Sequence, residues 1–229
     1  MPNAALGRVA AIIPAAGSGT RLGSSIPKAF VELNGLTLLS RSAHAMSSCV
    51  DVIVVSVPEN YLDAAAKELA EVDAEIHIVI GGSDRQASVA NGLAVIPEDV
   101  EVVLVHDAAR PLVPVHVVEQ VIQAVRDGSQ AVVPVLPVVD TLKRVNPIGV
   151  VVETVDRSSL RRIQTPQGFI RSLLDSAYAD PTHVATDDAG LVESMGVQVH
   201  TVAGDERALK ITTEHDLAMA KLMEQEVKR

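Results

Sequence analysis

Short runs rich in valine and isoleucine alternate along this chain with segments of helical spacing, and no other feature constrains the fold as much. The apolar runs span residues 9–13, 52–57, 76–80, 102–105 and 131–135. Between them, apolar residues three or four positions apart form three sets: Leu62, Ala65, Leu69 and Val72; Val89, Leu93 and Ile96; and Val118, Ile122 and Val125. Strands that alternate with helices pair in parallel, and strands that are apolar throughout are covered on both faces. The sequence therefore predicts an α/β fold with a doubly wound, mostly parallel, Rossmann-like sheet.

Length and hydropathy indicate one domain without a membrane span. We expect residues 1–229 to form a single domain, because α/β domains of this size are common. No apolar run approaches the roughly 18 to 20 residues that cross a bilayer. An apolar stretch near the N-terminus resembles a signal peptide, but Pro14 and Gly17 interrupt it and Arg21 follows. We therefore predict a cytoplasmic protein with no membrane partner.

Composition excludes several classes of function. Cys49 is the only cysteine, so an intramolecular disulfide and a zinc cluster of thiolates are both impossible. A net charge of −10, with no tryptophan, two tyrosines and two phenylalanines, argues against nucleic acid as a partner. If the ligand is anionic, a few local cations or a bound metal ion must balance its charge.

The alternation of strands and helices ends after Pro134. Residues 137–156 form two extended segments around a turn that contains Asn146, Pro147 and Gly149, which predicts a β-arm. A hairpin that leaves the body of a protein usually meets another surface, so we predict a homodimer.

The C-terminal part of the chain returns to a strand followed by a helix. We expect the strand at residues 197–202. Thr213 with Asp216 three positions later is a capping-box pattern, which predicts where the last helix begins.

Three loops follow the predicted strands, at residues 14–28, 81–88 and 106–111. They are rich in glycine, serine, aspartate and arginine. Because ligands of doubly wound sheets bind at the carboxyl ends of the strands, we expect the functional site at these loops.

The first loop has the features of a phosphate cradle. Gly17 and Gly19 leave room for backbone N–H groups to approach anionic oxygens. The Walker motif is absent, and Leu22 stands where a dinucleotide fingerprint needs glycine. A glycine-rich turn that carries Arg21 and Lys28 remains, and a tight turn with two solvated cations is the simpler alternative.

The second loop repeats this pattern. Gly81 and Gly82 permit close approach of the backbone, and Arg85 and Ser88 lie one turn apart on the helix that follows. The alternative is an ordinary strand-to-helix turn in which Asp84 caps the helix.

The third loop supplies a candidate metal ligand. Asp107 lies just past a buried strand, where a carboxylate can hold Mg²⁺ that also coordinates phosphate oxygens. The alternative is an ion pair between Asp107 and Arg110. His106 is interpreted as structural, because no nearby residue pairs with it as an acid or a base.

Later candidates are weak when taken one at a time. Lys210 is most simply a solvated cation, and Asp187 and Asp188 beside Thr186 are most simply helix caps. No Ser/His/Asp, Cys/His or His-rich arrangement is present, so acyl transfer and zinc hydrolysis have no visible machinery. Several loop cations, one candidate metal carboxylate and no obvious base favour attack on a phosphate, which depends mainly on positioning and charge stabilisation.

The motifs occur in an order that is specific to one family. PAAGSGTRLG with PK, GGSDR, VHDAARP, VVDTLK, TVDR, TPQGF, TDDA and KITT together resemble the 2-C-methyl-D-erythritol 4-phosphate cytidylyltransferase family over about residues 9–222. The resemblance implies that CTP and a polyol phosphate are the substrates and that Mg²⁺ is the cofactor. It also implies in-line attack of methylerythritol phosphate on the α-phosphorus of CTP, which releases pyrophosphate. A phosphate monoester is already an anion near neutral pH, so this reaction needs no base.

The resemblance also assigns roles to residues of this chain. Catalytic roles are implied for Arg21, Lys28, Arg157 and Lys210. Nucleotide binding is implied for Pro14, Ala15, Ala16, Gly17, Gly19, Gly82, Ser83, Arg85, Ser88, Asp107 and Ala108, with Asp107 also holding the metal. Binding of the sugar phosphate is implied for Arg110, Thr141, Arg157, Thr165 and Asp205.

Two of these assignments depend on features beyond a single motif. Thr141 and Arg157 are expected to reach the active site of the partner subunit from the β-arm. Asp205 stands five positions before Lys210, whereas the family often has a second acidic residue shortly before this lysine.

Two alternatives to this function remain. Ribitol-5-phosphate cytidylyltransferase shares the fold and several motifs, but its first loop usually has paired glycines where this chain has PAAG. A non-catalytic nucleotide-binding protein is the other alternative. Arg21, Lys28, Asp107 and Lys210 argue against it, because a binding module does not need cations on both sides of a scissile bond.

Overall fold

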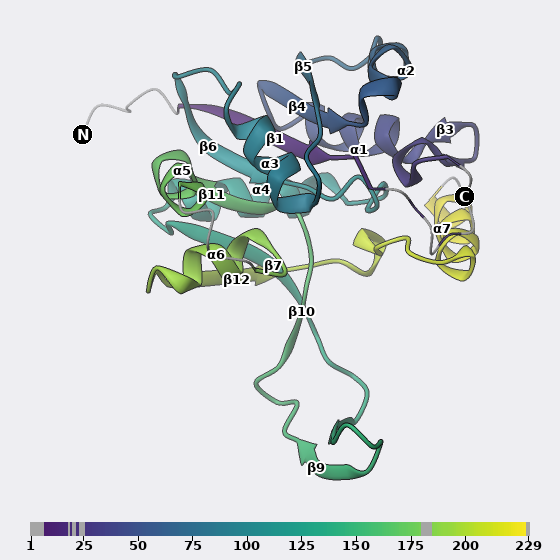
Figure 1. Ribbon diagram of the computed structural model, residues 1–229, viewed down its shortest axis with the longest axis vertical. Coiled ribbons are helices and arrows are strands. Elements are labelled where there is room, and N and C mark those ends of the chain that lie inside the picture. Colours follow the sequence, from purple (N-terminus) through teal and green to yellow (C-terminus); the bar gives the residue numbers. More distant parts are fainter. Residues whose placement is uncertain (1–6, 18, 20–21, 23–25, 180–184, 228–229) are drawn as a thin grey trace.

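The computed structural model describes residues 7–17, 19, 22, 26–179 and 185–227. In this part of the chain, an eight-stranded sheet has the order β10-β7-β11-β6-β1-β4-β5, with β12 beside β7 (Figure 1). Its strands are β1 (Arg8–Pro14), β4 (Val52–Val57), β5 (Glu75–Ile80), β6 (Val100–Val105), β7 (Ala131–Pro137), β10 (Arg161–Ile163), β11 (Gln167–Ile170) and β12 (Val199–Ala203).

The pairing within this sheet is mostly parallel, as predicted. β1 pairs in parallel with β4 and β6, β4 with β5, and β7 with β12. All five predicted apolar runs are strands. β11 was not predicted; it is antiparallel to both β6 and β7. It is only four residues long and lacks a valine and isoleucine run, so its local sequence resembles a loop.

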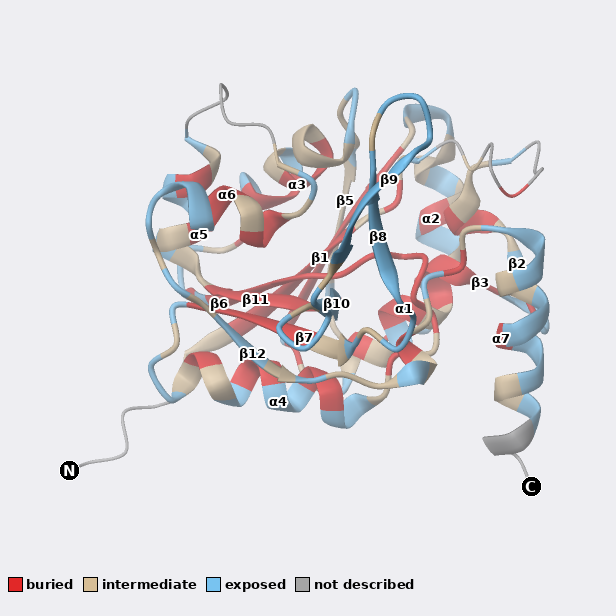
Figure 2. Ribbon diagram, turned by 90° about the horizontal axis from the view of Figure 1, so that it is seen from below, coloured by how far each residue is buried: buried red, intermediate tan, exposed pale blue. Residues whose placement is uncertain are grey.

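Helices cover both faces of the sheet. They are α1 (Leu38–Ser47), α2 (Leu62–Glu68), α3 (Arg85–Leu93), α4 (Val115–Arg126), α5 (Arg171–Tyr178), α6 (Asp188–Ser194) and α7 (Glu214–Val227). Residues of α1, α2 and α4 share one buried apolar cluster with Ala11 and Ile13 of β1, and residues of α3, α5 and α6 share a second with Ala10 and Ile12 (Figure 2). Because side chains alternate along a strand, β1 contributes to both clusters.

Two predicted helices end earlier than their apolar pattern. α2 ends at Glu68 and α3 at Leu93, whereas the apolar spacing continued to Val72 and Ile96. Both of these residues are buried in the turns that follow. The turns continue the apolar face without continuing the helical hydrogen bonds.

The predicted β-arm is a hairpin that projects from the body (Figure 1). β8 (Leu142–Val145) and β9 (Val151–Val155) pair antiparallel. In the turn, Asn146 Oδ1 accepts hydrogen bonds from the N–H groups of Ile148 and Val150, and Gly149 has a φ of 82°. Ile148 at the tip is 83% exposed.

The C-terminal helix α7 begins as predicted, with a reciprocal capping box. The Thr213 N–H donates to Asp216 Oδ2 at 2.8 Å, and the Asp216 N–H donates to Thr213 Oγ1 at 3.2 Å. A small apolar cluster joins Ala220 of α7 to Leu22 and Ile211. No helix among the described residues is both long enough and apolar enough to span a membrane.

Candidate active site

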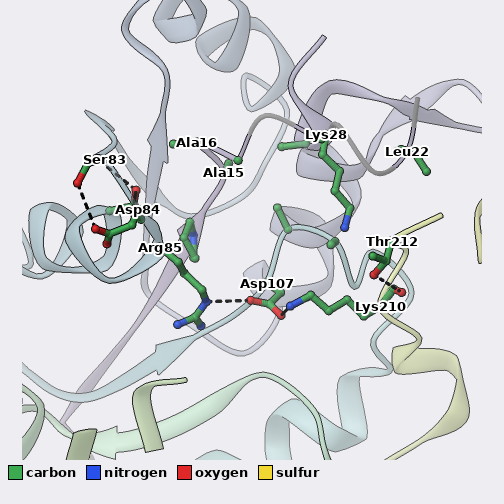
Figure 3. Close-up of a pocket in the computed structure, with 18 residues that line it drawn as sticks. Ala15, Ala16, Leu22, Lys28, Ser83, Asp84, Arg85, Asp107, Lys210 and Thr212 are labelled. Carbon is green, nitrogen blue, oxygen red and sulfur yellow. Dashed lines mark hydrogen bonds and ion pairs between the residues drawn. The ribbon is translucent and has the colours of Figure 1, made fainter. Parts of the chain in front are cut away.

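The three predicted loops meet around a cavity of about 510 Å³ (Figure 3). The cavity lies at the carboxyl ends of β1 and β6, with α3 at its side. Its lining comprises Pro14, Ala15, Ala16, Gly17, Gly19, Leu22, Lys28, Ala29, Gly82, Ser83, Asp84, Arg85, Ser88, Asp107, Ala108, Ala109, Lys210 and Thr212.

The first loop brings Lys28 to the pocket. The Lys28 N–H donates to the Gly17 carbonyl at 3.3 Å, which closes the loop upon itself. Gly19 has a φ of 71°, and a Cβ atom there would lie 2.9 Å from Lys28 Cβ, so only glycine suits this position. Arg21 lies outside the described residues.

The second loop packs against the first. A Cβ atom at Gly81 would lie 2.4 Å from Ala16 Cβ, so glycine allows the two loops to touch. Ser88 Oγ accepts a hydrogen bond from the Gly82 N–H at 3.0 Å. Asp84 caps α3 by accepting from the Ala87 N–H at 2.8 Å, and this hydrogen bond lowers the pKa of Asp84. The alternative of Asp84 as a cap is therefore correct, and Arg85 and Ser88 line the pocket as well.

Asp107 is the centre of the charged groups in the pocket. Its carboxylate lies 2.8 Å from Lys210 Nζ, 3.3 Å from Arg85 Nε and 3.7 Å from Arg110 Nε. Figure 3 shows Arg85 and Lys210 approaching it from opposite sides. Burial acts to raise the pKa of Asp107, but Arg85 and Lys210 outweigh burial and hold this pKa well below its ordinary range. Asp107 is therefore ionised at neutral pH.

The backbone of Asp107 is held by a buried chain of hydrogen bonds. Its N–H donates to Thr165 Oγ1 at 3.0 Å, and Thr165 Oγ1 lies 3.2 Å from His106 Nδ1. His106 Nε2 lies 3.3 Å from the Arg110 carbonyl, which can only accept, so Nε2 carries the proton and Nδ1 accepts from the Thr165 hydroxyl. Burial lowers the pKa of His106 to about 4. The interpretation of His106 as structural fits this arrangement.

Arg110 lies behind the pocket and does not line it. Its Nη1 donates to the Ala208 carbonyl at 2.6 Å and its Nη2 to the Ile163 carbonyl at 3.3 Å. Burial lowers the pKa of Arg110, and Asp107 partly offsets this. The ion pair between Asp107 and Arg110 that the sequence left open is present, at 3.7 Å.

Four other predicted residues lie outside the pocket lining, and Thr165, which holds the Asp107 N–H, is one of them. Thr141 and Arg157 are exposed at the arm, where Arg157 donates to the Val139 carbonyl. Asp205 accepts from the side chain of Arg207 at 3.2 Å.

Every nucleotide-binding residue predicted from the resemblance lines the cavity, as do Lys28 and Lys210. Five further lining residues were not predicted as site residues: Leu22, Ala29, Asp84, Ala109 and Thr212. Asp84 was considered only as a helix cap. Thr212 belongs to the KITT motif, which contributed to the family resemblance, but no role in the site was assigned to Thr212 itself. The three apolar residues carry no chemical signal in the sequence.

The chain was compared with known proteins. Residues 9–226 match the family model of 2-C-methyl-D-erythritol 4-phosphate cytidylyltransferase. Proteins of this name from Saccharopolyspora erythraea and Rhodococcus jostii are 51% and 48% identical to the chain. The alignments cover 93% of this chain and 97% of the first relative, and 96% of both chains for the second.

Solved structures agree with the sequence matches. The crystal structure of 4-diphosphocytidyl-2C-methyl-D-erythritol synthase from Anaerococcus prevotii has a TM-score of 0.84 at 30% identity and covers 96% of each chain. The 2-C-methyl-D-erythritol 4-phosphate cytidylyltransferase of Thermus thermophilus has a TM-score of 0.79 at 36% identity. That match covers 95% of this chain and 99% of the other.

Proposed function

The chain belongs to the 2-C-methyl-D-erythritol 4-phosphate cytidylyltransferase family, and we propose that the pocket around Asp107 is where it carries out the family's reaction. The protein transfers CMP from CTP to 2-C-methyl-D-erythritol 4-phosphate, which gives CDP-methylerythritol and pyrophosphate. The ribitol-5-phosphate alternative finds no support in the family match.

One observation carries the proposed location: Lys28, Arg85 and Lys210 all line a pocket whose central anion is Asp107. Both substrates are phosphate anions, so cations from two sides of the pocket can face the nucleotide and the acceptor. Most of the other lining residues of the first two loops are glycine, alanine or serine, which leaves room for the base and ribose close to the backbone.

The chemistry needs charge stabilisation and alignment more than proton transfer. An oxygen of the acceptor phosphate forms a bond to the α-phosphorus of CTP, and the bond from this phosphorus to the bridging oxygen breaks, with both electrons leaving on pyrophosphate. Lys28 stabilises the charge that develops on the triphosphate. Lys210 leaves Asp107 to orient the attacking phosphate. Groups of this kind act strongly in a pocket that is shielded from water.

The pocket also suits Mg²⁺ that arrives with the nucleotide. Among the described residues, no group of three or more His, Cys, Asp and Glu side chains is placed to hold a metal. Mg²⁺ is commonly held by one or two carboxylates together with substrate phosphates, which the position of Asp107 permits. When bound there, Mg²⁺ would neutralise charge on the phosphates.

The acceptor side of the site depends on a second subunit in this proposal. Thr141 and Arg157 are exposed, and they precede β8 and follow β9 in the sequence. The arm that these two strands form projects from the body (Figure 1). Several apolar side chains of the arm are also exposed, among them Val145, Ile148 and Val151. In a homodimer these apolar residues meet the partner, and the arm brings Thr141 and Arg157 to the partner's pocket. Arg110, Thr165 and Asp205 keep their proposed roles on the acceptor side.

Pyrophosphate release by the purified protein with CTP and Mg²⁺ tests the function. Release is expected with 2-C-methyl-D-erythritol 4-phosphate and is expected to be absent with ribitol 5-phosphate. Release with ribitol 5-phosphate alone would mean that ribitol 5-phosphate, and not 2-C-methyl-D-erythritol 4-phosphate, is the acceptor. Folded protein that binds CTP but releases nothing with either acceptor would contradict the activity. A location in the cytoplasm and a single domain over residues 1–229 stay predictions.

A further inference from the structure

The two aspartates of the TDDA motif have different contacts. Asp187 caps α6 by accepting from the Gly190 N–H at 3.1 Å, as predicted for a cap. Asp188 does not cap the helix, so its prediction as a cap was wrong. Its side chain points into the protein and is fully buried, which leaves its charge to be explained.

The two carboxylate oxygens of Asp188 each accept a hydrogen bond. Arg85 Nη2 donates to Oδ2 at 2.7 Å, and the Tyr178 hydroxyl donates to Oδ1 at 2.5 Å. A buried carboxylate is costly unless charge and hydrogen bonds compensate it, and here each oxygen has a partner. Burial raises the pKa of Tyr178, and the Asp188 charge raises it further.

Arg85 connects this buried carboxylate to the pocket. Its Nε donates to Asp107 Oδ1 at 3.3 Å, while Nη2 holds Asp188 at the shorter distance of 2.7 Å. A guanidinium is planar, so contacts through two of its nitrogens to separate carboxylates define its plane. Burial acts to lower the pKa of Arg85, but Asp188 and Asp107 outweigh it, and Arg85 stays charged.

The N-terminus of α6 is itself tied to the sheet. Gln167 of β11 donates to Asp187 Oδ2 at 2.7 Å and accepts from the Ala189 N–H at 3.0 Å. These two hydrogen bonds flank Asp188 and set where its carboxylate lies relative to β6, the strand that ends just before Asp107.

We propose that Asp188 is a positioning residue for nucleotidyl transfer: it anchors Arg85 in the wall of the nucleotide pocket from behind, so that Arg85 keeps its place when Lys210 leaves Asp107 for the attacking phosphate. Tyr178 supports Asp188 in this role. The inference rests on the proposed location of the nucleotide. It predicts an effect on the CTP side of the reaction, because Arg85 belongs to the second loop and lines the pocket together with Ser83 and Ser88.

The test compares Asp188→Asn with Glu193→Gln, which also replaces a carboxylate of α6 by an amide. Glu193 is exposed and takes no part in the contacts of Asp188, Arg85 and Gln167 described above. Asp187→Asn is not a suitable control, because it removes the carboxylate oxygen that accepts from Gln167. In Asp188→Asn we expect a higher KM for CTP, weaker CTP binding by calorimetry and a lower kcat. The KM for the acceptor should not change. The loss in kcat/KM for CTP should be on the order of 10-fold to 10²-fold, the scale of misplacing a group in an active site.

An Arg85→Gln background separates positioning from a structural role. If Asp188 acts through Arg85, adding Asp188→Asn to Arg85→Gln causes no further loss. Full additivity of the two losses would overturn the proposal. So would wild-type kinetics in Asp188→Asn, or equal changes in the KM of CTP and of the acceptor.

Tyr178→Phe keeps the proposal testable if Asp188→Asn does not fold. This variant removes one hydrogen-bond donor without removing a charge. We therefore expect the KM for CTP to rise and kcat to fall as in Asp188→Asn, but by smaller factors. Unchanged kinetics would overturn the proposal. An inactive wild-type protein in this assay would contradict the proposed function instead. An active wild-type protein with an unaffected Asp188→Asn variant would contradict this inference alone.

Discussion

At the scale of single residues, Asp107 depends on groups from distant parts of the chain. Arg85 and Lys210 hold its carboxylate, and Thr165 holds its backbone N–H. The positive charge around this carboxylate exceeds its own negative charge. The pocket is therefore suited to anionic ligands although the whole chain carries a net charge of −10.

Lys28 gives the most direct test of charge stabilisation. We expect Lys28→Ala to lower kcat on the order of 10²-fold, the typical loss for one preorganised group that stabilises a transition state. Lys67→Ala is the control, because Lys67 is exposed on α2 and does not line the pocket. Turnover near that of the wild type in Lys28→Ala would remove Lys28 from the mechanism.

The ionisation of Tyr178 reports on the buried Asp188 carboxylate. Because the pKa of Tyr178 is raised in the folded protein, the unfolded chain loses the phenol proton at a lower pH than the folded protein does. Tyr178 therefore lowers the free energy of unfolding as the pH rises past the ordinary pKa of tyrosine. In Asp188→Asn we expect the phenolate of Tyr178 to form at lower pH, because a neighbouring negative charge is removed.

Near-ultraviolet absorbance during an alkaline titration measures this ionisation. The chain has two tyrosines and no tryptophan, so the phenolate signal is easily assigned. Glu193→Gln should titrate like the wild type, because Glu193 is exposed and takes no part in the contacts of Asp188 described above. If Asp188→Asn also titrates like the wild type, the two side chains do not interact as described.

At the scale of elements, the structure of a single subunit does not account for the β-arm. Within the described part of the chain, β8 and β9 pair only with each other, and exposed apolar residues lie along both strands. An isolated two-stranded hairpin is marginally stable, so a partner surface gives the arm both a support and a purpose.

Hybrid dimers test whether the arm acts on the partner's pocket. Mixing inactive Arg157→Ala protein with inactive Lys28→Ala protein should restore activity, because one site of each hybrid then combines an intact pocket with an intact arm. Random exchange makes half of the dimers hybrid, so roughly a quarter of wild-type activity is expected.

A second mixture is the control for these hybrids. Lys28 and Lys210 line the same pocket, so mixing Lys28→Ala with Lys210→Ala protein should restore nothing. No recovery in the first mixture after confirmed subunit exchange would place Arg157 and Lys28 in one subunit's site.

At the scale of the whole molecule, the sheet order decides which loops meet. β1 lies between β4 and β6, so the loops after β1 and β6 open at the same edge. The loop after β5 reaches them because Gly81 packs against Ala16. This agrees with the general rule that ligands of doubly wound sheets bind at the carboxyl ends of their strands.

The sequence by itself determined the features that depend on short-range patterns. Apolar runs and helical spacing predicted five strands and helices on both faces of the sheet. The turn residues around Asn146 predicted the arm. The capping box at Thr213 predicted where α7 begins. These predictions succeeded because backbone propensity and side-chain periodicity act within a few residues.

Only the tertiary structure decided which side chains meet across the sheet. β11 enters between β6 and β7 without a run of apolar residues, because its place depends on pairing with strands that are distant in the sequence. Asp187 and Asp188 have the same chemistry and are adjacent, yet one caps a helix and the other anchors Arg85. No local pattern separates them, because the contact between Asp188 and Arg85 joins residues 103 positions apart and exists only once the sheet has brought α3 and α6 to the same face.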